Sequence, residues 1–335
     1  MSIRKVAAQA GVSTATVSRV FTQPRAVADE TRRRVMTAAE ELRYAPHAAA
    51  SSLARGRTCN LGIVVPDISN SFSAVVTKAV DRQARREGYA LFVAGSDEVV
   101  HDEEASARAL AQQVDGLLLV SPQMPDDALL ALAGRTPVVM LNRLLDGIPA
   151  VLTNLYEATG HAVEHLHALG HRTVVYLAGP DGYANDVRLR GFRDACSRLG
   201  MEASELGPFA ARFTAGVHAA DLVLATSVTS VVAYNDEIAV GVVNRLADRG
   251  IGVPGDVSVV GFDDTQLAEM VTPRLTTVRI PAAMAGTAAA ELLLDLVRGR
   301  DAGLRSPREI SAELVVRSST GPARVAPGTG QDPAP

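Results

Sequence analysis

The stretch VAAQAGVSTATVSRV, residues 6–20, decides the fold of the N-terminal part of the chain. The apolar side chains before its glycine repeat at the spacing of one buried helix face, namely Ile3, Val6, Ala7 and Ala10. Gly11 predicts the end of this helix, and Ser13 is a residue type that caps a following helix. The stretch therefore predicts a helix capped by Ser2, a tight turn, and a second short helix over residues 14–21.

The second helix has two different faces. Its large apolar side chains cluster on one side, and they are Val17, Val20 and Phe21. Small or basic side chains form the opposite face, and they are Thr14, Ala15, Thr16, Ser18 and Arg19. A helix, a turn with glycine and a second helix with a small polar face describe a helix-turn-helix, whose second helix enters the DNA major groove. There Arg19 can donate to guanine O6 and N7, hydroxyls can contact bases or phosphates, and the Ala15 methyl can contact thymine.

A third helix is expected over residues 29–44. It buries Val35, Ala39 and Leu42 and presents three arginines to solvent or phosphate, which are Arg32, Arg33 and Arg34. An ordinary three-helix bundle with a solvated basic face has the same pattern, so this alternative stays open at this point.

The charge of the chain is divided unevenly. The formal net charge is −4, which by itself argues against a nucleic-acid partner. Residues 1–57, however, carry ten Lys/Arg and four Asp/Glu, a net of +6, so residues 58–335 carry 23 and 33, a net of −10. The N-terminal part is therefore suited to an anionic partner.

A short alanine-rich stretch follows the third helix. Pro46 precedes residues 47–54, and a helix of this length is too short to be stable alone in water. Leu53 is its one large apolar residue, which suggests a wedge inserted into the DNA minor groove. Packing of Leu53 against the next domain is the alternative.

The sequence resembles the LacI/GalR-type transcription regulators along nearly the whole chain. The matching motifs are Val6-Ala7, Ala10-Gly11-Val12-Ser13, Ala15-Thr16-Val17-Ser18-Arg19-Val20, Thr31-Arg32, Tyr44 with Pro46, Ser52-Leu53, and residues 62–70, GIVVPDISN. The resemblance implies that Thr14, Ala15, Thr16 and Arg19 read each DNA half-site. It also implies that Leu53 pairs with the same residue of a second subunit to open a central base step. Ala28 departs from the capping serine of the family, and we expect Asp29 to cap one residue later.

The rest of the chain alternates short apolar runs with amphipathic segments, as a parallel α/β sheet does. The first series contains strands 61–65, 89–94, 116–120 and 138–141 and helices 72–87 and 101–113. A second series contains helices 157–169, 186–199, 236–249 and 282–298 and strands 173–178, 230–234 and 257–262. Two sheets suggest two lobes.

The expected organisation is an all-α headpiece over residues 1–45, a hinge helix over 46–58, a two-lobed α/β domain over 59–317, and a disordered Pro/Gly-rich tail over 318–335. The resemblance implies that the two-lobed domain is of the type I periplasmic-binding-protein kind.

Polar residues directly after the strands are candidate ligand contacts, because ligands of open α/β sheets bind beyond the carboxyl ends of strands. These residues are Asp67, Ser121, Asn142, Asn235, Asp236, Asp263 and Asp264. The resemblance adds Arg188 as an arginine that reaches into the interlobe cleft, and it assigns ligand contacts to Asp67, Asn142, Asn235 and Asp263. A structural cap or an interlobe ion pair is the alternative for Arg188 and Asp263. Phe72 is either an apolar wall of the cleft or a core residue.

The chemical class of the effector is left open by departures in the cleft. A sugar is the family's commonest ligand, and carboxylates, amides and arginine suit sugar hydroxyls. Here Thr153-Asn154 replaces the Asp-Asn of many relatives, and Ala211 stands where several relatives have an aromatic side chain. The chain has no Trp and only 4% aromatic residues. No motif in the sequence indicates whether the effector releases the protein from DNA or recruits it to DNA. The resemblance implies release, which is the commoner behaviour in the family.

Two other functions share features with this sequence. His161, Glu164 and His165 match the HxxEH pattern of an inverted zinc peptidase, but zinc needs a third protein ligand. GxGxxG, P-loop and GxSxG motifs are absent from the sequence, and we expect neither an enzyme nor a bound cofactor. A binding receptor for transport shares the two-lobed architecture, but the basic helical headpiece and the missing export signal favour a regulator.

Cellular context and assembly follow from the same features. Cys59 and Cys196 do not form a disulfide framework, and no apolar run is long enough to span a bilayer. We therefore expect a cytoplasmic protein with no membrane partner. Paired headpieces suit a pseudo-palindromic operator in double-stranded DNA, so a homodimer that binds a small-molecule effector is expected.

Overall fold

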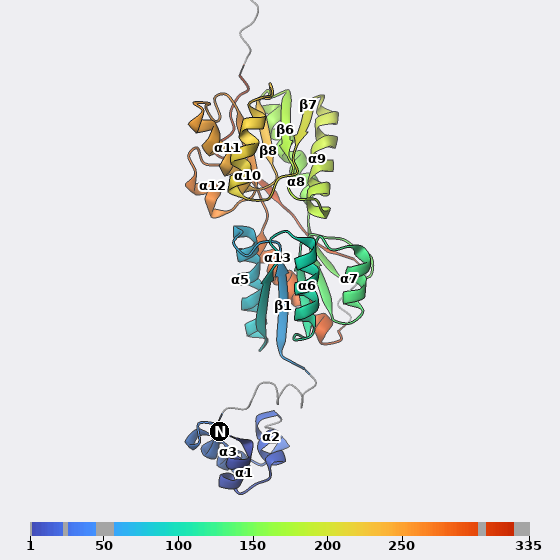
Figure 1. Cartoon of the computed structure of the whole chain (residues 1–335), viewed down its shortest axis with the longest axis vertical. Coiled ribbons are helices and arrows are strands. Elements are labelled where there is room, and N and C mark those ends of the chain that lie inside the picture. The colour runs from blue at the N-terminus through green and yellow to red at the C-terminus, as the bar shows by residue number, and fades with distance from the viewer. Residues whose placement is uncertain (1, 23–25, 45–56, 301–305, 325–335) are drawn as a thin grey trace, which may run out of the picture. The chain divides into compact units, whose positions relative to one another are not determined.

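The computed structural model describes residues 2–22, 26–44, 57–300 and 306–324. Its contacts divide the chain into two compact units (Figure 1). One unit comprises residues 1–60 with Gln113–Asp115, and the other contains the remaining residues. The predicted hinge helix, except for its last two residues, lies outside the described residues, as does Leu53.

The described part of the N-terminal unit contains three helices, as the apolar spacing predicts. They are α1 (Ile3–Ala10), α2 (Thr14–Thr22) and α3 (Asp29–Glu41). One apolar side chain from each helix is completely buried at the centre, and these are Val6, Val17 and Val35. Gly11 ends α1 with a left-handed φ of 64°, and its N–H lies within hydrogen-bond reach of the last carbonyls of α1.

The caps of these helices are partly as expected. Ser13 Oγ accepts a hydrogen bond from the Thr16 N–H at 3.1 Å, so Ser13 caps α2. Ser2 occupies the N-cap position of α1 without a side-chain hydrogen bond. The expected cap by Asp29 is wrong, because Asp29 is already helical and forms an ion pair with Arg32 at 2.8 Å. Ala28 holds the N-cap position of α3.

Arg34 differs from its predicted role as a solvent-facing or phosphate-facing side chain. Its Nη2 donates to the carbonyl oxygen of Ala10 and lies 3.4 Å from that of Gly11. These carbonyls belong to the C-terminal end of α1, whose last carbonyls have no partner within the helix. Arg34 therefore ties α3 to the turn between the first two helices.

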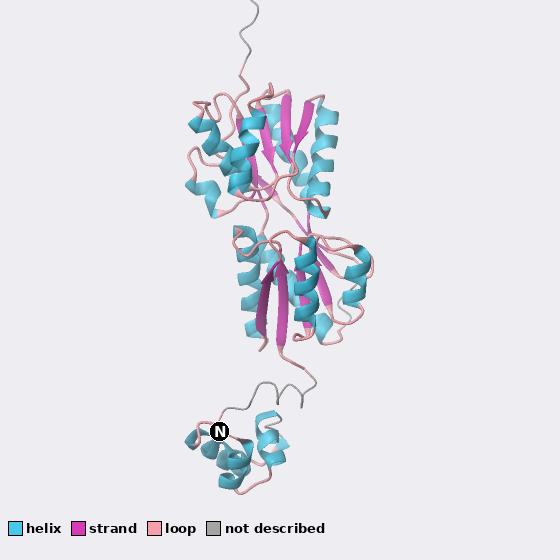
Figure 2. Ribbon diagram, in the orientation of Figure 1, coloured by secondary structure: helices cyan, strands magenta, loops and turns pink. Residues whose placement is uncertain are grey.

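The first lobe of the larger unit contains a six-stranded sheet in the order β11-β5-β4-β3-β1-β2. Its strands are β1 (Asn60–Val65), β2 (Ala90–Gly95), β3 (Gly116–Val120), β4 (Val138–Leu141), β5 (Ala150–Thr153) and β11 (Arg308–Ile310). The neighbouring strand pairs β1–β3, β3–β4, β4–β5 and β5–β11 are all parallel. Helices α5 (Ser71–Arg86), α6 (Val100–Ala111), α7 (Asp126–Ala133) and α13 (Ala282–Val297) flank this sheet (Figure 2).

The second lobe repeats this plan with a sheet in the order β12-β10-β9-β8-β6-β7. Its strands are β6 (Thr173–Leu177), β7 (Glu202–Leu206), β8 (Ser230–Ala233), β9 (Ser258–Asp263), β10 (Thr276–Arg279) and β12 (Glu313–Val315). Only β12 is antiparallel to its neighbour. The helices are α8 (Leu155–Ala168), α9 (Tyr183–Leu199), α10 (Phe213–Val223), α11 (Asp236–Asp248) and α12 (Gln266–Met270).

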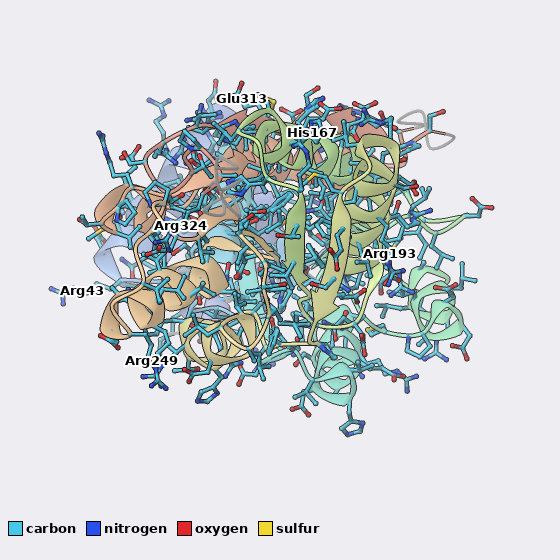
Figure 3. The ribbon with its side chains drawn as sticks, turned by 90° about the horizontal axis from the view of Figure 1, so that it is seen from above. Arg43, His167, Arg193, Arg249, Glu313 and Arg324 are labelled. Atoms are coloured by element: carbon cyan, nitrogen blue, oxygen red, sulfur yellow. The ribbon has the colours of Figure 1, made fainter. Side chains whose placement is uncertain are left out.

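The two faces of this second sheet are covered by different helices. On one face, apolar side chains of the strands form a core with α8 and α9. On the opposite face, the strands form a second core with α10 and α11. Charged side chains cover the outside of the lobe (Figure 3). Arg193 forms an ion pair with Glu205 at 2.6 Å, and Arg249 forms one with Asp221 at 3.0 Å.

One helix is assigned to the wrong lobe by its place in the sequence. The segment 282–298 follows the second series of strands, but α13 packs with α5 in the core of the first lobe. The chain crosses between the lobes at Asn154, at residues 280–281 and at residues 311–312, in the part that the structure describes. The crossings are linked, because the Asn154 N–H donates to the Ile310 carbonyl at 3.0 Å.

The segment 318–324 is not the start of a disordered tail, in contrast to the sequence expectation. Ser319 is completely buried, and its Oγ accepts from the Thr276 N–H at 2.8 Å and donates to the Val259 carbonyl at 2.6 Å. The Ala323 N–H donates to the Leu169 carbonyl at 2.8 Å. Side-chain and backbone hydrogen bonds hold this segment on the second lobe without an apolar periodicity. Residues 325–335 lie outside the described residues.

Candidate functional site

A polar cleft lies between the two lobes, at the carboxyl ends of strands from both sheets. Seven of the nine candidate residues line it, namely Asp67, Phe72, Ser121, Asn142, Arg188, Asn235 and Asp263. Asp236 and Asp264 do not, because Asp236 accepts hydrogen bonds from Thr265 and Thr277 and Asp264 forms ion pairs with Arg279 and Arg317. The cleft contains about 520 Å³ of space between atoms, including its opening to solvent. Residues far apart in the sequence therefore converge, as the rule for open α/β sheets requires.

Backbone strain is concentrated at this cleft. Half of the described non-glycine residues with positive φ line it, and these are Glu98 (63°), Ser121 (46°), Asn142 (57°) and Asp263 (103°). L-residues adopt such angles at a cost of about 1 to 3 kcal/mol, and strained residues gather where a side chain must be aimed for function. In each case the left-handed residue directly ends or closely follows a strand.

Arg188 is the cation at the centre of the site. It comes from α9 and is only 4% exposed. Its guanidinium lies 4.3 Å from the centroid of the Tyr234 ring and 4.8 Å from that of Phe262, while Nη2 lies 3.6 Å from Asp263 Oδ1. Because α9 and β9 belong to the same lobe, the ion pair is not an interlobe one. Nε and Nη1 of Arg188 have no hydrogen-bond partner in the described protein.

Several carboxyl groups around the cleft have raised pKa values. Burial raises the pKa of Asp263 to about 6, and the Arg188 charge partly opposes this. Burial and neighbouring carboxylates raise the pKa of Glu237, in the first turn of α11, to about 7. Burial also raises the pKa of Glu98, and Asp67 adds to this in the same direction. Carboxyl groups in this state ionise more readily when a ligand offers a positive charge or hydrogen-bond donors.

The two asparagines are fixed by hydrogen bonds to their own lobes. Asn142 Oδ1 accepts from the N–H and the hydroxyl of Thr153, at 3.1 and 2.7 Å. Asn235 Oδ1 caps α11 by accepting from the Ile238 N–H at 2.9 Å, and its Nδ2 donates to the Ala211 carbonyl at 3.0 Å. Thr153 and Ala211, which depart from the family pattern, therefore have defined partners.

Phe72 fits both of the interpretations considered for it. It packs against apolar cores of both lobes and also lines the cleft. Its backbone N–H donates to Asn70 Oδ1 at 2.9 Å, in the cap of α5.

Four polar or aromatic residues that line the cleft are missed by the sequence reasoning, namely Asn70, Ser73, Glu98 and Tyr234, and Glu237 beside the cleft is missed as well. Tyr234 directly follows β8, so the rule of residues after strands could have found it. Glu98 lies three residues beyond β2, and its approach depends on the left-handed backbone. Asn70 Nδ2 donates to Glu237 Oε1 at 3.0 Å, and the Ala211 N–H donates to Glu98 Oε2 at 3.4 Å, each across the two lobes.

A second candidate surface lies on α2 in the N-terminal unit. Thr14, Ala15 and Arg19 are exposed, whereas Thr16 and Ser18 are half-buried. Thr16 Oγ1 lies 2.9 Å from Ser13 Oγ, so this hydroxyl takes part in the cap. The small, basic face predicted from the sequence is thus available for contact.

The HxxEH pattern does not build a metal site in the described part of the chain. His165 Nε2 lies 2.9 Å from Thr320 Oγ1, and Glu164 forms an ion pair with Arg198 at 2.7 Å. Groups of three or more potential metal-binding side chains are not found among the described residues. Within the same residues, no helix combines the length and apolar character needed to cross a bilayer.

A helix-turn-helix unit followed by a two-lobed α/β domain with a polar cleft defines a DNA-binding regulator with a ligand-binding domain. Residues 2–47 match the model described as bacterial regulatory proteins, lacI family, and residues 163–320 match a periplasmic binding protein-like domain. The transcriptional regulator GalR of Salmonella typhimurium (strain SL1344) is 35% identical over 307 residues, covering 88% of this chain and 89% of GalR. The chain therefore belongs to the lacI family.

Solved structures agree with this assignment. The Lac repressor dimer bound to operator and the anti-inducer ONPF has a TM-score of 0.84 at 27% identity, covering 96% of this chain and 99% of that one. The complex of the transcriptional regulator CelR with cellobiose has a TM-score of 0.70 at 30% identity, with 95% and 99% covered. The relatives are transcriptional regulators rather than enzymes, so the protein is a DNA-binding transcriptional regulator.

Proposed function

We propose that this protein is a cytoplasmic, homodimeric repressor whose affinity for an operator is controlled by a sugar or sugar derivative bound between its lobes. The Lac repressor provides the analogy of a dimer on its operator, and CelR that of a regulator with a bound disaccharide. In this proposal the pseudo-palindromic operator matches the two-fold symmetry of the dimer.

The observation that carries the effector part is the state of Arg188. Leaving a buried donor without a partner costs about 1 to 3 kcal/mol, and more when the group is charged. Nε and Nη1 of Arg188 are two such donors in the wall of an otherwise polar cleft. Hydroxyl oxygens of a ligand would satisfy both, and the neighbouring Asp263 carboxylate would accept from hydroxyl groups in return.

The DNA part depends on the exposed face of α2. Arg19 is the long side chain of this face and has the donor geometry that reads guanine in the major groove. Thr14 and Ala15, also exposed, can contact a phosphate or a thymine methyl. Leu53, although outside the described residues, is proposed to open a central base step together with its mate in the second subunit.

Coupling between the two sites requires two arrangements of the lobes. In the part of the chain that the structure describes, three segments cross between the lobes, and the hydrogen bonds Asn70–Glu237 and Ala211–Glu98 join them as well. A ligand that bridges the lobes changes the balance between an open and a closed cleft, and thereby the geometry that the crossing segments impose on the first lobe. We propose that binding of the effector releases the operator.

The proposal is tested in two stages with the full-length protein. First, selection from random double-stranded DNA should enrich one pseudo-palindromic site. Next, fluorescence anisotropy on this site, with a panel of sugars, should identify a compound that weakens binding. Arg188→Ala should keep the affinity for the site and lose at least about 90% of the response, because a ligand contact worth about 1.5 to 3 kcal/mol is removed.

Arg190→Ala is the matched control, because Arg190 lies on the same helix but is exposed. It should respond as the wild type does. Loss of DNA binding in Arg188→Ala alone would mean that Arg188 is structural, and selection without a preferred sequence would contradict the operator.

A further inference from the structure

The interlobe cleft contains an excess of negative charge that its own cations do not balance. Asp67, Glu98 and Asp263 line it, and Arg188 is the only cation among the described lining residues. Glu237 does not line the cleft but accepts a hydrogen bond from the lining residue Asn70. It adds a fourth carboxyl group to the cleft, because its charge interacts with those of Asp67, Glu98 and Asp263. Arg212 is the further cation that acts on Glu98.

Arg188 lies on the side of the cleft formed by the second lobe and contacts residues of that lobe. Arg188 Nη2 faces Asp263 at 3.6 Å, and its guanidinium lies over the rings of Tyr234 and Phe262. Since Nε and Nη1 remain without partners, this side needs oxygen acceptors from a ligand. Two buried arginine donor atoms without acceptors indicate a ligand, and this indication does not depend on Asp67, Glu98 or Glu237.

The other side consists of carboxyl groups with few donors of their own. Glu98 accepts from the Ala211 N–H at 3.4 Å, a long contact, and Glu237 accepts from Asn70 Nδ2 at 3.0 Å and from the backbone N–H of Ser71. Asp67 uses Oδ1 for the N–H and the hydroxyl of Ser69, both at 2.7 Å. Burial and mutual repulsion disfavour the ionised forms of Glu98 and Glu237. A positive charge placed among them would relieve both effects.

We infer that the effector carries a protonated amine, seated against Asp67 and Glu98 with the charge of Glu237 close by, on a hydroxylated frame whose oxygens contact Arg188. The chemical class is therefore an amino sugar or a similar hydroxylated amine, and the neutral sugars are weaker ligands. This inference rests on the proposed function, since it assumes that the cleft is the effector site, and it narrows the class of that effector.

The test is isothermal titration calorimetry of the full-length protein with matched probes. D-Glucosamine and D-galactosamine are each compared with the neutral parent sugar and with the N-acetyl derivative, which keeps the nitrogen but removes its charge. We expect at least one amine to bind about tenfold or more tightly than both of its neutral counterparts, because hydrogen bonds between charged groups are stronger than those of neutral groups.

Variants connect this preference to the named residues. Glu98→Gln keeps an acceptor for the Ala211 N–H and removes the charge, so it should reduce the preference for the amine by about tenfold while neutral sugars change little. Glu202→Gln, on the exposed strand β7, is the matched control and should leave both unchanged. An unaltered preference in Glu98→Gln would contradict the placement of the amine.

Other outcomes separate this inference from the proposed function. Binding of a neutral sugar as tight as that of its amine overturns the inference but leaves a sugar effector in place. Putrescine and ethanolamine are included as amines without a sugar ring. If only putrescine or ethanolamine binds, the protonated amine of the inference is supported and the hydroxylated sugar frame is wrong. If no amine binds, the inference is wrong.

Discussion

At the scale of single residues, Asp236 illustrates how a carboxyl group is held next to the cleft without entering it. It is completely buried. Oδ1 accepts from the Thr277 hydroxyl at 2.6 Å, and Oδ2 accepts from the N–H and hydroxyl of Thr265 at 2.6 and 3.0 Å. Burial and the Asp263 charge nevertheless raise the pKa of Asp236 to about 8. Asp236 was a candidate ligand contact by position, but its hydrogen bonds give it a structural role.

This raised pKa predicts a loss of stability with rising pH. Between pH 5 and pH 8 an unfolded Asp has released its proton, whereas native Asp236 retains it, so the folded state binds more protons and becomes less stable as pH rises. The free energy of unfolding should fall by up to about 1.4 kcal/mol per pH unit for this group. Urea denaturation of wild type and Asp236→Asn at both pH values measures the difference.

Asp236→Asn should make this part of the pH dependence disappear, because the amide imitates the protonated acid and can donate to Thr277 Oγ1. Glu205→Gln, which changes an exposed carboxylate on β7, is the control for a general charge effect. If the variant and the wild type lose the same stability between pH 5 and pH 8, the proton is not held at Asp236.

Arg19 carries the residue-scale prediction for DNA. Arg19→Ala should weaken the selected operator by about 1 to 3 kcal/mol, because a bidentate contact to guanine is lost, while binding to unrelated DNA persists. Anisotropy titrations on both DNAs check this. Arg33→Ala, on the exposed side of α3, should weaken both DNAs equally or neither. An equal loss on both DNAs in Arg19→Ala would argue against base reading.

The cleft shows what the sequence can and cannot predict at this scale. One rule predicts Asp67, Ser121 and Asp263, because each lies at the end of a buried parallel strand or within two residues of it. The rule does not predict Glu98, since its position depends on two successive left-handed residues, Asp97 and Glu98. Non-glycine residues seldom adopt this conformation, so neither periodicity nor propensity indicates it.

At the scale of elements, the apolar runs predict most strands of aliphatic residues and miss the polar ones, and they also miss the short buried strand β5. β3 and β4 have the predicted bounds, and they consist of buried aliphatic residues. β10 escapes the pattern because Thr276 and Thr277 are buried polar residues, satisfied by hydrogen bonds to Thr320 and Asp236. The strand β7 is also not predicted by the apolar pattern, because β7 lies at the edge of its sheet and is mostly exposed.

Long-range connectivity also limits what the sequence predicts. The position of α13 after the second sheet favours the second lobe, but its buried face completes the core of the first lobe. The local sequence of an amphipathic helix specifies that one face is buried, not against which sheet. The same holds for segment 318–324, whose hydroxyl and backbone partners are far away in the sequence.

The turn of the helix-turn-helix gives an element-scale prediction with a matched control. Gly11 and Gly200 both end helices with φ of 64°. A Cβ at Gly11 would lie 2.9 Å from Arg34 Nη2, whereas one at Gly200 would meet no heavy atom within 4 Å. Gly200→Ala should cost about 1 to 2 kcal/mol of stability from the left-handed backbone alone and keep operator affinity.

Gly11→Ala should have the same strain and also displace Arg34 from the Ala10 carbonyl. We expect operator affinity to fall by about tenfold or more, since a lost hydrogen bond from a charged group disturbs the unit that presents α2. Anisotropy and thermal unfolding of both variants provide the comparison. Equal DNA affinity of the two variants would show that the turn tolerates a side chain.

At the scale of the whole molecule, the division of charge predicts which part meets DNA. The net charge of +6 on residues 1–57 can release counterions from phosphates, whereas the −10 on residues 58–335 is repelled by them. The logarithm of the affinity of the full chain should fall linearly with the logarithm of salt concentration, by about 0.9 per phosphate contacted.

Removal of residues 1–57 should abolish DNA binding at every salt concentration, including low salt, where non-specific attraction is strongest. The remaining lobes have cores of their own, so the truncated protein should unfold cooperatively and still bind the effector, which controls for misfolding. Anisotropy titrations from 50 to 300 mM salt compare it with the full chain. Salt-dependent DNA binding by the truncated protein would place a DNA contact on the acidic lobes. The positive charge of residues 1–57 and the negative charge of residues 58–335 would then not separate DNA binding from effector binding.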